Sequence, residues 1–230
     1  TAKLLVHRWP SFLNGIYYNS PLSRSKIKPF VEILRIDPSQ FEKDLADYRS
    51  FNEFFARKLK PGLRPICDDP LSVTSPGDGR LLVFPQIDED SLSYVKWAPV
   101  KLIELFNRDQ ALVERYRGGA CAVLRLAPSD YHRFHFPAGG MAGPSRTVPG
   151  LLHSVSPYAL EEKIPVFALN KRTICSVETE RLGWVLLLEV GAMGVGSIVQ
   201  TYTPGAHVSR GQEKGYFKYG GSTSILFMEP

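Results

Sequence analysis

Residues 184–190 read Trp-Val-Leu-Leu-Leu-Glu-Val, a nearly continuous apolar stretch of strand length. Short apolar or alternating runs bounded by Gly and Pro are typical of β-strands. Similar runs recur in the middle and C-terminal parts of the chain, at residues 80–84, 120–126, 197–203 and 224–227. One helix, around residues 100–116, is expected to interrupt them. The pattern therefore predicts an α+β fold with a predominantly antiparallel β core, either barrel-like or sandwich-like.

The N-terminal part is expected to be helical instead. Over residues 23–36, apolar side chains fall at helical spacing between basic ones. Residues 37–40 and 50–53 read as helix starts, because each begins with a capping Asp or Ser and ends with a Gln or Glu that reaches back. The chain is therefore predicted to comprise an N-terminal helical region, residues 1–65, and a β-rich domain, residues 66–230.

Composition limits the class of protein. The chain has 230 residues, of which 43% are hydrophobic, so it can bury a sizeable core and disorder is not expected. The net charge of +5 favours an anionic partner, such as nucleic acid, anionic lipid or an acidic substrate, or simply a solvated basic surface. The three Cys are widely spaced and odd in number, which indicates reduced thiols and no metal site.

The N-terminal helices are a candidate for a membrane-binding segment. They combine basic residues with aromatic ones, including Trp9, Phe12, Tyr17 and Tyr18. Such a segment can lie on an anionic bilayer with its apolar face down, although from the residues alone packing against the β core is the commoner outcome. No apolar run reaches the ~18 residues of a membrane span, and no signal-peptide pattern opens the chain.

Residues capable of chemistry occur in three short segments. His132 and His135 lie in one extended stretch, where they would face apart unless the chain bends at the following Pro. Asp78 lies in a tight Pro-Gly-Asp-Gly turn, which either uses its carboxylate locally or fixes it to orient a histidine. Ser222 follows two glycines, so the Gly221 carbonyl is unshielded.

Serine, histidine and aspartate together allow a nucleophile, a base and an orienting group. The order Asp78, His135, Ser222 is no objection, because such triads recur in several chain orders. The Gly-x-Ser-x-Gly elbow of common hydrolases is absent, however. From the residues alone, each member also has an ordinary structural explanation.

Six segments, taken in order along the chain, favour the catalytic explanation. They are Ser-Phe-Asn-Glu-Phe-Phe-Ala-Arg-Lys-Leu (residues 50–59, followed by Arg64-Pro65), Ser-Pro-Gly-Asp-Gly (75–79), Leu-Ala-Pro-Ser-Asp-Tyr-His-Arg-Phe-His-Phe-Pro (126–137), Asn-Lys-Arg (170–172), Val-Gly-Ala-Met-Gly-Val-Gly-Ser-Ile (190–198) and Lys-Gly-Tyr-Phe-Lys-Tyr-Gly-Gly-Ser-Thr (214–223). Together they resemble the phosphatidylserine decarboxylase family. Lys171 departs from it, since the family has an acidic residue there.

The resemblance implies a self-processing enzyme. Asp78 would orient His135, and His135 would remove the proton from Ser222, whose oxygen attacks the Gly221 carbonyl. An N-to-O acyl shift, β-elimination and hydrolysis would then convert residue 222 into a pyruvoyl group. Residues 1–221 would become the β subunit and the rest the α subunit. Nine residues, 222 to 230, follow the expected cut, whereas the resemblance implies a longer α chain.

The resemblance also implies a substrate and a location. The pyruvoyl cofactor, covalently derived from Ser222, would form a Schiff base with phosphatidylserine and draw off electrons as CO2 leaves. His132 is the candidate for contacting the substrate carboxylate or protonating the carbanion. The partners would be phosphatidylserine, an anionic membrane surface and the protein's own α and β chains, with homo-oligomers possible and no nucleic acid. The protein would be peripheral on a bacterial inner membrane or an organelle membrane.

Three alternatives stay open at this stage. A pyruvoyl-dependent decarboxylase of an amino acid such as tryptophan would share the Gly-Gly-Ser ending and the histidines. A Ser-His-Asp lipid hydrolase would keep Ser222 intact. A membrane-binding module without catalytic activity would use only its basic helices.

Overall fold

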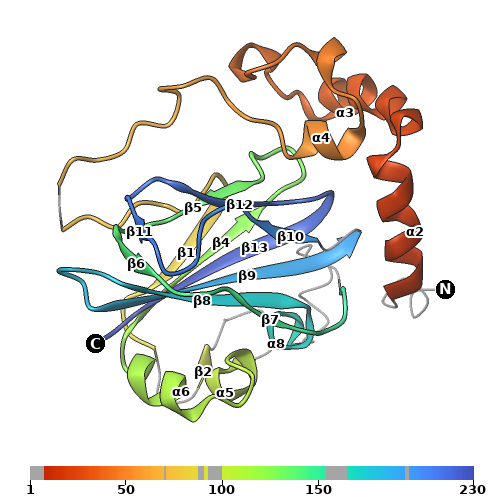
Figure 1. Ribbon diagram of the computed structural model, residues 1–230. Coiled ribbons are helices and arrows are strands. Elements are labelled where there is room, and N and C mark those ends of the chain that lie inside the picture. Colours follow the sequence, from red (N-terminus) through yellow and green to blue (C-terminus); the bar gives the residue numbers. More distant parts are fainter. Residues whose placement is uncertain (1–7, 70, 88–90, 93–99, 154–164, 195–196) are drawn as a thin grey trace.

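The fold is built on one large antiparallel sheet. The computed structural model describes residues 8–69, 71–87, 91–92, 100–153, 165–194 and 197–230. The sheet has the strand order β1-β4-β13-β9-β8-β6-β11, and β7 also pairs with β8 (Figure 1). Its strands are β1 (Arg80–Phe84), β4 (Ala120–Leu126), β6 (Gly140–Ala142), β7 (Arg146–Val148), β8 (Arg172–Glu178), β9 (Trp184–Gly194), β11 (His207–Val208) and β13 (Gly220–Met228).

A second sheet of three strands has the order β10-β12-β5, and a short pair joins β2 to β3. These strands are β2 (Ser91–Leu92), β3 (Val100–Lys101), β5 (Arg133–His135), β10 (Ile198–Gln200) and β12 (Glu213–Phe217). All the strand pairs of the described residues are antiparallel. The predicted α+β class with an antiparallel core is confirmed. Among the described residues the large sheet is open between its edges β1 and β11, so it does not close into a barrel.

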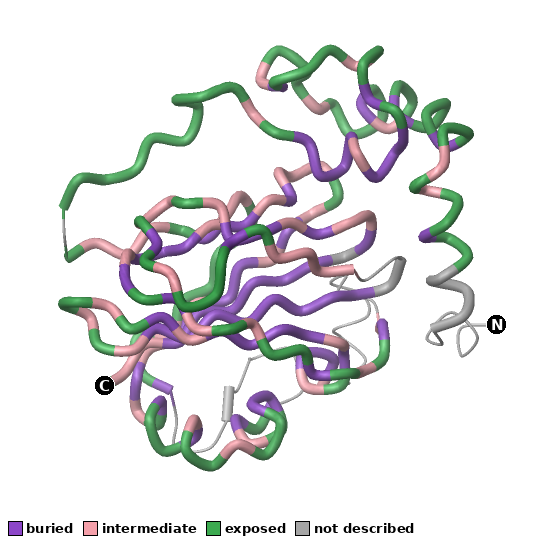
Figure 2. The backbone as a smooth tube through the Cα atoms, viewed as in Figure 1, coloured by how far each residue is buried: buried purple, intermediate pink, exposed green. Residues whose placement is uncertain are grey.

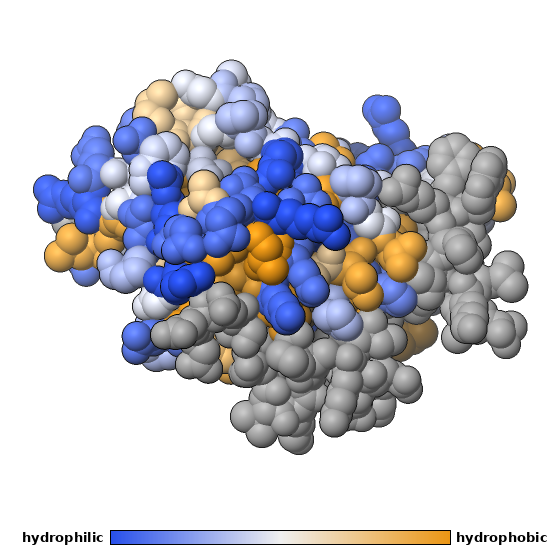
Figure 3. Space-filling view, turned by 90° about the horizontal axis from the view of Figure 1, so that it is seen from below, coloured by the Kyte–Doolittle hydropathy of each residue, from blue (hydrophilic) through white to orange (hydrophobic). Residues whose placement is uncertain are grey.

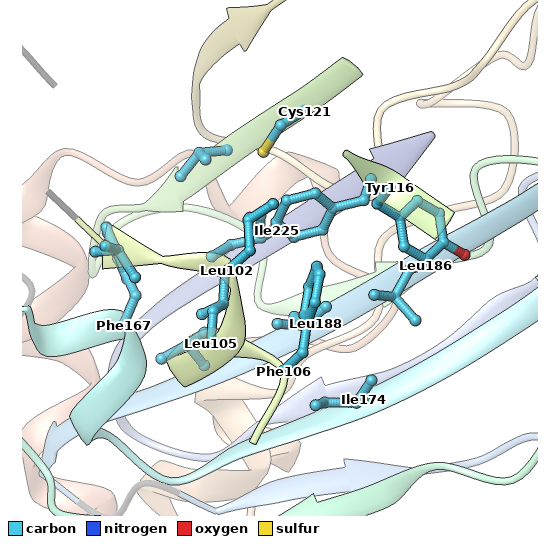
Figure 4. Packing of buried hydrophobic residues seen from close by; sticks show 14 of the residues in the cluster. Leu102, Leu105, Phe106, Tyr116, Cys121, Phe167, Ile174, Leu186, Leu188 and Ile225 are labelled. Carbon is cyan, nitrogen blue, oxygen red and sulfur yellow. The ribbon is translucent and has the colours of Figure 1, made fainter. Parts of the chain in front are cut away.

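The two faces of the large sheet are covered differently, because side chains alternate along each strand. Helices α5, α6 and α8 cover one face, where Leu102, Phe106 and Phe167 pack against strand residues such as Leu188 and Ile225 (Figure 4). The three-stranded sheet covers part of the opposite face, through a cluster of Leu124, Leu126, Phe134, Phe217 and Ile198. The central strands are consequently buried on both sides (Figure 2).

The space between the two sheets also holds a buried ion pair. Lys214 of β12 and Glu189 of β9 lie 2.9 Å apart (Nζ to Oε2), and both side chains are fully buried. Thr173 donates to the same carboxylate, while Gln200 and Ser145 receive further hydrogen bonds from the ammonium. A buried charge is tolerated only when it is paired and hydrogen-bonded, and this network meets that condition. It therefore ties the small sheet to the large one.

The helices are α2 (Arg8–Asn19), α3 (Ile27–Leu34), α4 (Phe51–Phe55), α5 (Leu102–Leu105), α6 (Gln110–Tyr116) and α8 (Val166–Leu169), with 3₁₀ turns η1 (Pro21–Lys26), η2 (Pro38–Gln40) and η3 (Leu45–Asp47). The N-terminal group, from α2 to α4, lies on the opposite side of the molecule from α5 and α6 (Figure 1). Two predicted starts are confirmed as caps: Asp37 accepts a hydrogen bond from Ser39 N–H, and Ser50 accepts one from Glu53 N–H.

Two predicted helices are wrong in extent. The Asp37 cap opens only a 3₁₀ turn, because Phe41 leaves the helical path and bridges to Leu59 in an antiparallel pair. The helix expected over residues 100–116 is divided into α5 and α6. Asn107 and Arg108 break it, since both adopt left-handed backbone angles (φ 59° and 65°) that no helix continues through.

The N-terminal helices form their own aromatic cluster. Phe51, Phe54 and Phe55 of α4 are at most 2% exposed and pack with Phe30 and Tyr18. Tyr18 thus packs internally, whereas Tyr17 is more than a third exposed. The side chains of Trp9 and Phe12 lie outside the described residues. Among the described residues, no helix combines the length and hydrophobicity needed to cross a membrane.

Replacing Lys214 by Met should destabilise the fold by about 3–5 kcal/mol, because Glu189 is left as an uncompensated buried charge. The double variant Lys214→Met/Glu189→Leu should recover most of that loss. Urea unfolding of both variants, in a chain kept intact by Ser222→Ala, measures the difference. If Lys214→Met alone is as stable as its parent, the pair does not hold the two sheets together.

Candidate active site

Ser222 lies inside the large sheet. It is on β13, between β4 and β9, and is paired with Leu126 on one side and Gly191 on the other. Its exposed fraction is 0%. A β-bulge separates it from Gly220, whose φ of 146° suits a glycine. The strand therefore fixes the serine hydroxyl within the large sheet and out of contact with bulk water.

His132 is the hydrogen-bond partner of Ser222. Its Nδ1 lies 3.0 Å from the Ser222 Oγ, and its Nε2 lies 3.1 Å from the carbonyl oxygen of Ala127. A carbonyl oxygen can only accept, so Nε2 carries the proton and Nδ1 presents a lone pair. In this tautomer, the Ser222 hydroxyl donates to His132. The serine is thus oriented by a neutral imidazole.

The surroundings of His132 keep it neutral. Its ring is fully buried and stacks on Phe55 of α4, with ring centres 3.9 Å apart. Burial, and secondarily the positive charge of Arg57, lowers the pKa of His132 to about 3. Arg57 is itself 3% exposed and donates from Nη2 to the Ser129 and Asp130 carbonyls. His132 is therefore a good hydrogen-bond acceptor but a reluctant proton acceptor.

His135 does not lie against Ser222, contrary to the sequence-based expectation. It is on β5, paired with Glu213 of β12, and its ring stacks on Tyr131 at 5.8 Å. Among the described residues no hydrogen bond joins it to Ser222. The physical reason is the extended chain, which turns residues 132 and 135 in different directions. Burial lowers the pKa of His135, while the charges of Glu213 and Asp78 act in the opposite direction.

Asp78 is held by an arginine, and the expected hydrogen bond to His135 is absent among the described residues. Arg64 donates hydrogen bonds to the Asp78 carboxylate from Nε, at 2.9 Å to Oδ1 and 3.0 Å to Oδ2, and from Nη2, at 2.6 Å to Oδ2. Such a bidentate pair orients a carboxylate strongly. Asp78 thus acts on His135 through its charge and not through direct contact. A cavity of about 330 Å³ opens beside it, and its lining includes Arg57, Arg64, Asp130 and Tyr131.

Helix α4 also belongs to the site, a role that the sequence alone did not indicate. Phe55 contacts His132, and Asn52 accepts a hydrogen bond from the Tyr219 backbone at 2.8 Å. The only signal was the presence of residues 50–59 in the family-like pattern. Asn170 is a second case, since it donates to the carbonyl of Gly191, the strand partner of Ser222, at 2.9 Å.

Comparisons with known proteins point to one family. The family model described as phosphatidylserine decarboxylase matches residues 51–230. A phosphatidylserine decarboxylase proenzyme of Chlamydia muridarum is 47% identical over 216 residues, which cover 94% of this chain and 71% of that protein. One from Desulfitobacterium hafniense (strain Y51) is 47% identical over 224 residues (96% and 74%), and one from Clostridium perfringens (strain SM101) is 44% identical over 219 residues (95% and 74%).

The match includes the strand with Ser222, the histidine segment and the helix that supports them. These relatives are 44–47% identical to this chain over 94–96% of its length. The chain therefore belongs to the phosphatidylserine decarboxylase family.

Proposed function

We propose that this chain is the proenzyme of a pyruvoyl-dependent decarboxylase that converts phosphatidylserine to phosphatidylethanolamine and CO2. One observation carries the proposal: a fully buried serine, preceded by two glycines, donates a hydrogen bond from its hydroxyl to a neutral histidine. Such a serine is shielded from external substrates but is adjacent in the chain to its own Gly221 carbonyl. This arrangement favours attack on the backbone over hydrolysis of a soluble substrate.

The processing chemistry follows from that adjacency. The Ser222 oxygen bonds to the Gly221 carbonyl carbon, the peptide C–N bond breaks, and the amide becomes an ester with a free amine at residue 222. Loss of the α-proton then expels the Gly221 carboxylate and leaves dehydroalanine. Addition of one water releases ammonia and leaves a ketone. The β chain ends at residue 221 and the α chain begins at residue 222.

We assign different tasks to the two histidines. A general base works best when its pKa lies near the working pH, and His132, with a pKa of about 3, is far below it. Burial lowers the pKa of His135 as well, but the carboxylates of Glu213 and Asp78 oppose that effect, and we therefore assign the role of base to His135. His132 would orient the Ser222 hydroxyl. His135 would take the hydroxyl proton once the Ser222 side chain rotates away from His132. Because residues 132 and 135 of the uncleaved chain face in different directions, this role also requires the His135 ring to turn toward the rotated Ser222 side chain.

The surroundings of residue 222 fit a pyruvoyl group. It would be held in β13 by the backbone pairing of Ser222 and would lie beside His132. When formed, it supplies an electrophilic carbonyl that captures the substrate amine and accepts electrons as CO2 leaves. His132 would then contact the substrate. The cavity beside Asp78, whose walls carry both charge signs, suits a headgroup that has an amine, a carboxylate and a phosphate.

We further propose that residues 1–65 place the enzyme on an anionic membrane surface as a peripheral protein. Leu13, Ile16, Leu22 and Ile33 project from the N-terminal helices with exposed fractions of 64, 56, 78 and 78%. Basic residues lie among them, and the substrate itself is a bilayer lipid. The face seen from below in Figure 3 is a mixture of hydrophilic and hydrophobic side chains in its described part. The exposed apolar and basic side chains of the N-terminal helices make these helices the candidate for bilayer contact.

Self-processing is tested by mass spectrometry of the purified protein and its variants. We expect two chains, with a ketone at the N-terminus of the α chain, and a single chain in Ser222→Ala. His135→Ala and Asp78→Ala should slow cleavage, by about 10²–10⁴-fold for the base. His132→Ala should slow cleavage less than His135→Ala does, because it removes only the group that orients the serine, and should lose decarboxylation; His207→Ala, at an exposed position, is the control.

Two results would contradict these assignments. If His135→Ala is cut at the normal rate while His132→Ala is not, His132 is the base. If the active protein is one intact chain whose Ser222 reacts with a fluorophosphonate, it is a hydrolase and the decarboxylase proposal fails.

The stability of the uncleaved Ser222→Ala chain should fall as the pH drops below about 6.5. The unfolded chain binds a proton at His132 near its ordinary pKa of 6.5, whereas the folded chain does so only near 3, so acid favours unfolding in that window. His135, whose pKa burial also lowers, acts in the same direction. Urea unfolding between pH 7 and 4 should give a shallower dependence in His132→Gln than in the control His207→Gln. Equal slopes would show that His132 is not held neutral.

Membrane contact is tested with vesicles that contain phosphatidylserine. The double variant Leu22→Gln/Ile33→Gln should sediment less with the vesicles, because about 25 cal/mol is lost per Å² of apolar area withdrawn from the bilayer. Leu71→Gln, a 63% exposed leucine outside the N-terminal region, is the matched control. Equal binding by all three proteins would exclude these helices as the docking surface.

A further inference from the structure

The chain entering the cleavage site is held by helix α4. The backbone N–H of Tyr219, two residues before Gly221, donates to the side-chain Oδ1 of Asn52 at 2.8 Å. Asn52 is 4% exposed. Because a backbone N–H can only donate, the amide orientation of Asn52 is fixed, and its Nδ2 is left to donate to Asn19 Oδ1 at 3.1 Å. The contact joins residues 167 positions apart.

The side chain of Tyr219 is held by the same helix. Its ring meets Phe51 and Phe55 edge-on, with ring centres 4.9 and 5.2 Å apart, and Tyr18 lies at 4.5 Å. Edge-to-face pairs of this kind favour one orientation of the rings. Backbone and ring of Tyr219 are therefore fixed together, upstream of the bond to be cut.

The other side of that bond is fixed as well, and again α4 takes part. Ser222 is paired to both neighbouring strands and donates to His132, and His132 stacks on Phe55. One short helix thus contacts both the residue before the two glycines and the histidine that orients the serine. Glycine backbones are the least restrained, so without the two anchors the segment would sample many conformations.

We propose that Asn52 is a positioning residue for self-cleavage, which anchors Tyr219 so that the Gly221 carbonyl stays within reach of the Ser222 oxygen. The proposal rests on the function proposed above. Holding two reacting groups in place removes most of the entropic barrier of an intramolecular reaction, and a displacement of about 1 Å can cost about 100-fold in rate. The neighbouring Glu53, whose carboxylate contacts Lys43 and the Arg49 N–H, faces away from this segment.

The test is the rate of cleavage of newly made full-length proenzyme, followed by gel electrophoresis after cell-free synthesis. Asn52→Leu removes the acceptor and should slow cleavage by about 10- to 100-fold. Asn52→Asp keeps an acceptor oxygen for Tyr219, and the Asn19 amide can turn to donate to it, so this variant should retain most of the rate. Asn19→Ala and Glu53→Gln should cleave like the parent.

A second readout separates positioning from later chemistry. Hydroxylamine cleaves esters, so it accelerates cutting only where the ester has formed and elimination is slow. It should not rescue Asn52→Leu, since that variant is expected to fail before the ester forms. The melting temperature of Asn52→Leu in the Ser222→Ala background checks folding; if that variant unfolds, Asn52→Ala replaces it, because alanine removes the same acceptor with a smaller side chain.

The outcomes are distinguishable from failure of the proposed function. If the parent protein itself does not cleave, the proposed function is wrong. If the parent cleaves and Asn52→Leu cleaves equally fast, or hydroxylamine restores its cutting, or Asn52→Asp is as slow as a folded Asn52→Leu, the role of Asn52 is overturned while the decarboxylase proposal stands.

Discussion

The hydrogen bond between the buried Ser222 hydroxyl and the neutral His132 is the contact on which the rest of the site depends. It forms only because β13 lies between two strands and because the Ala127 carbonyl fixes the tautomer of the imidazole. Burial lowers the pKa of His132 and so preserves the lone pair that receives the hydroxyl. A more exposed imidazole would be charged part of the time and would lose its acceptor.

The sheet gives this contact its rigidity. Ser222 lies on β13 beside β9, and the fully buried Glu189 of β9 pairs with Lys214 of β12, which ties the small sheet to the large one. β5 and β12 belong to the small sheet, so the position of the histidine segment relative to β13 depends on that junction. The N-terminal cluster adds support from outside through Phe55 and Asn52. The proposed membrane-facing region is thus in direct contact with the proposed cleavage site.

Local structure could be predicted where short-range rules decide it. The strands around residues 184–190 and 224–227 lie where continuous apolar runs placed them, because a strand buried on both faces needs no polar alternation. The Ser50 cap likewise depends only on residues within one helical turn. Predictions failed where a distant partner intervened. Phe41 pairs with Leu59 in a β-bridge instead of continuing a helix. The turn at Asn107 and Arg108 divides a segment that was expected to form one helix.

The sequence by itself singled out the residues to which the proposed chemistry is assigned. The Gly-Gly-Ser segment, the paired histidines and the Asp turn all belong to motifs that can be read within a dozen residues. It could not determine which histidine meets the serine or what holds the aspartate, since those contacts join Ser222 to a residue 90 positions away and Asp78 to an arginine 14 positions away. Strand register and burial decide such contacts, and both depend on how the whole sheet assembles. Only the tertiary structure therefore revealed the neutral His132 against Ser222 and the asparagine that holds the neighbouring chain.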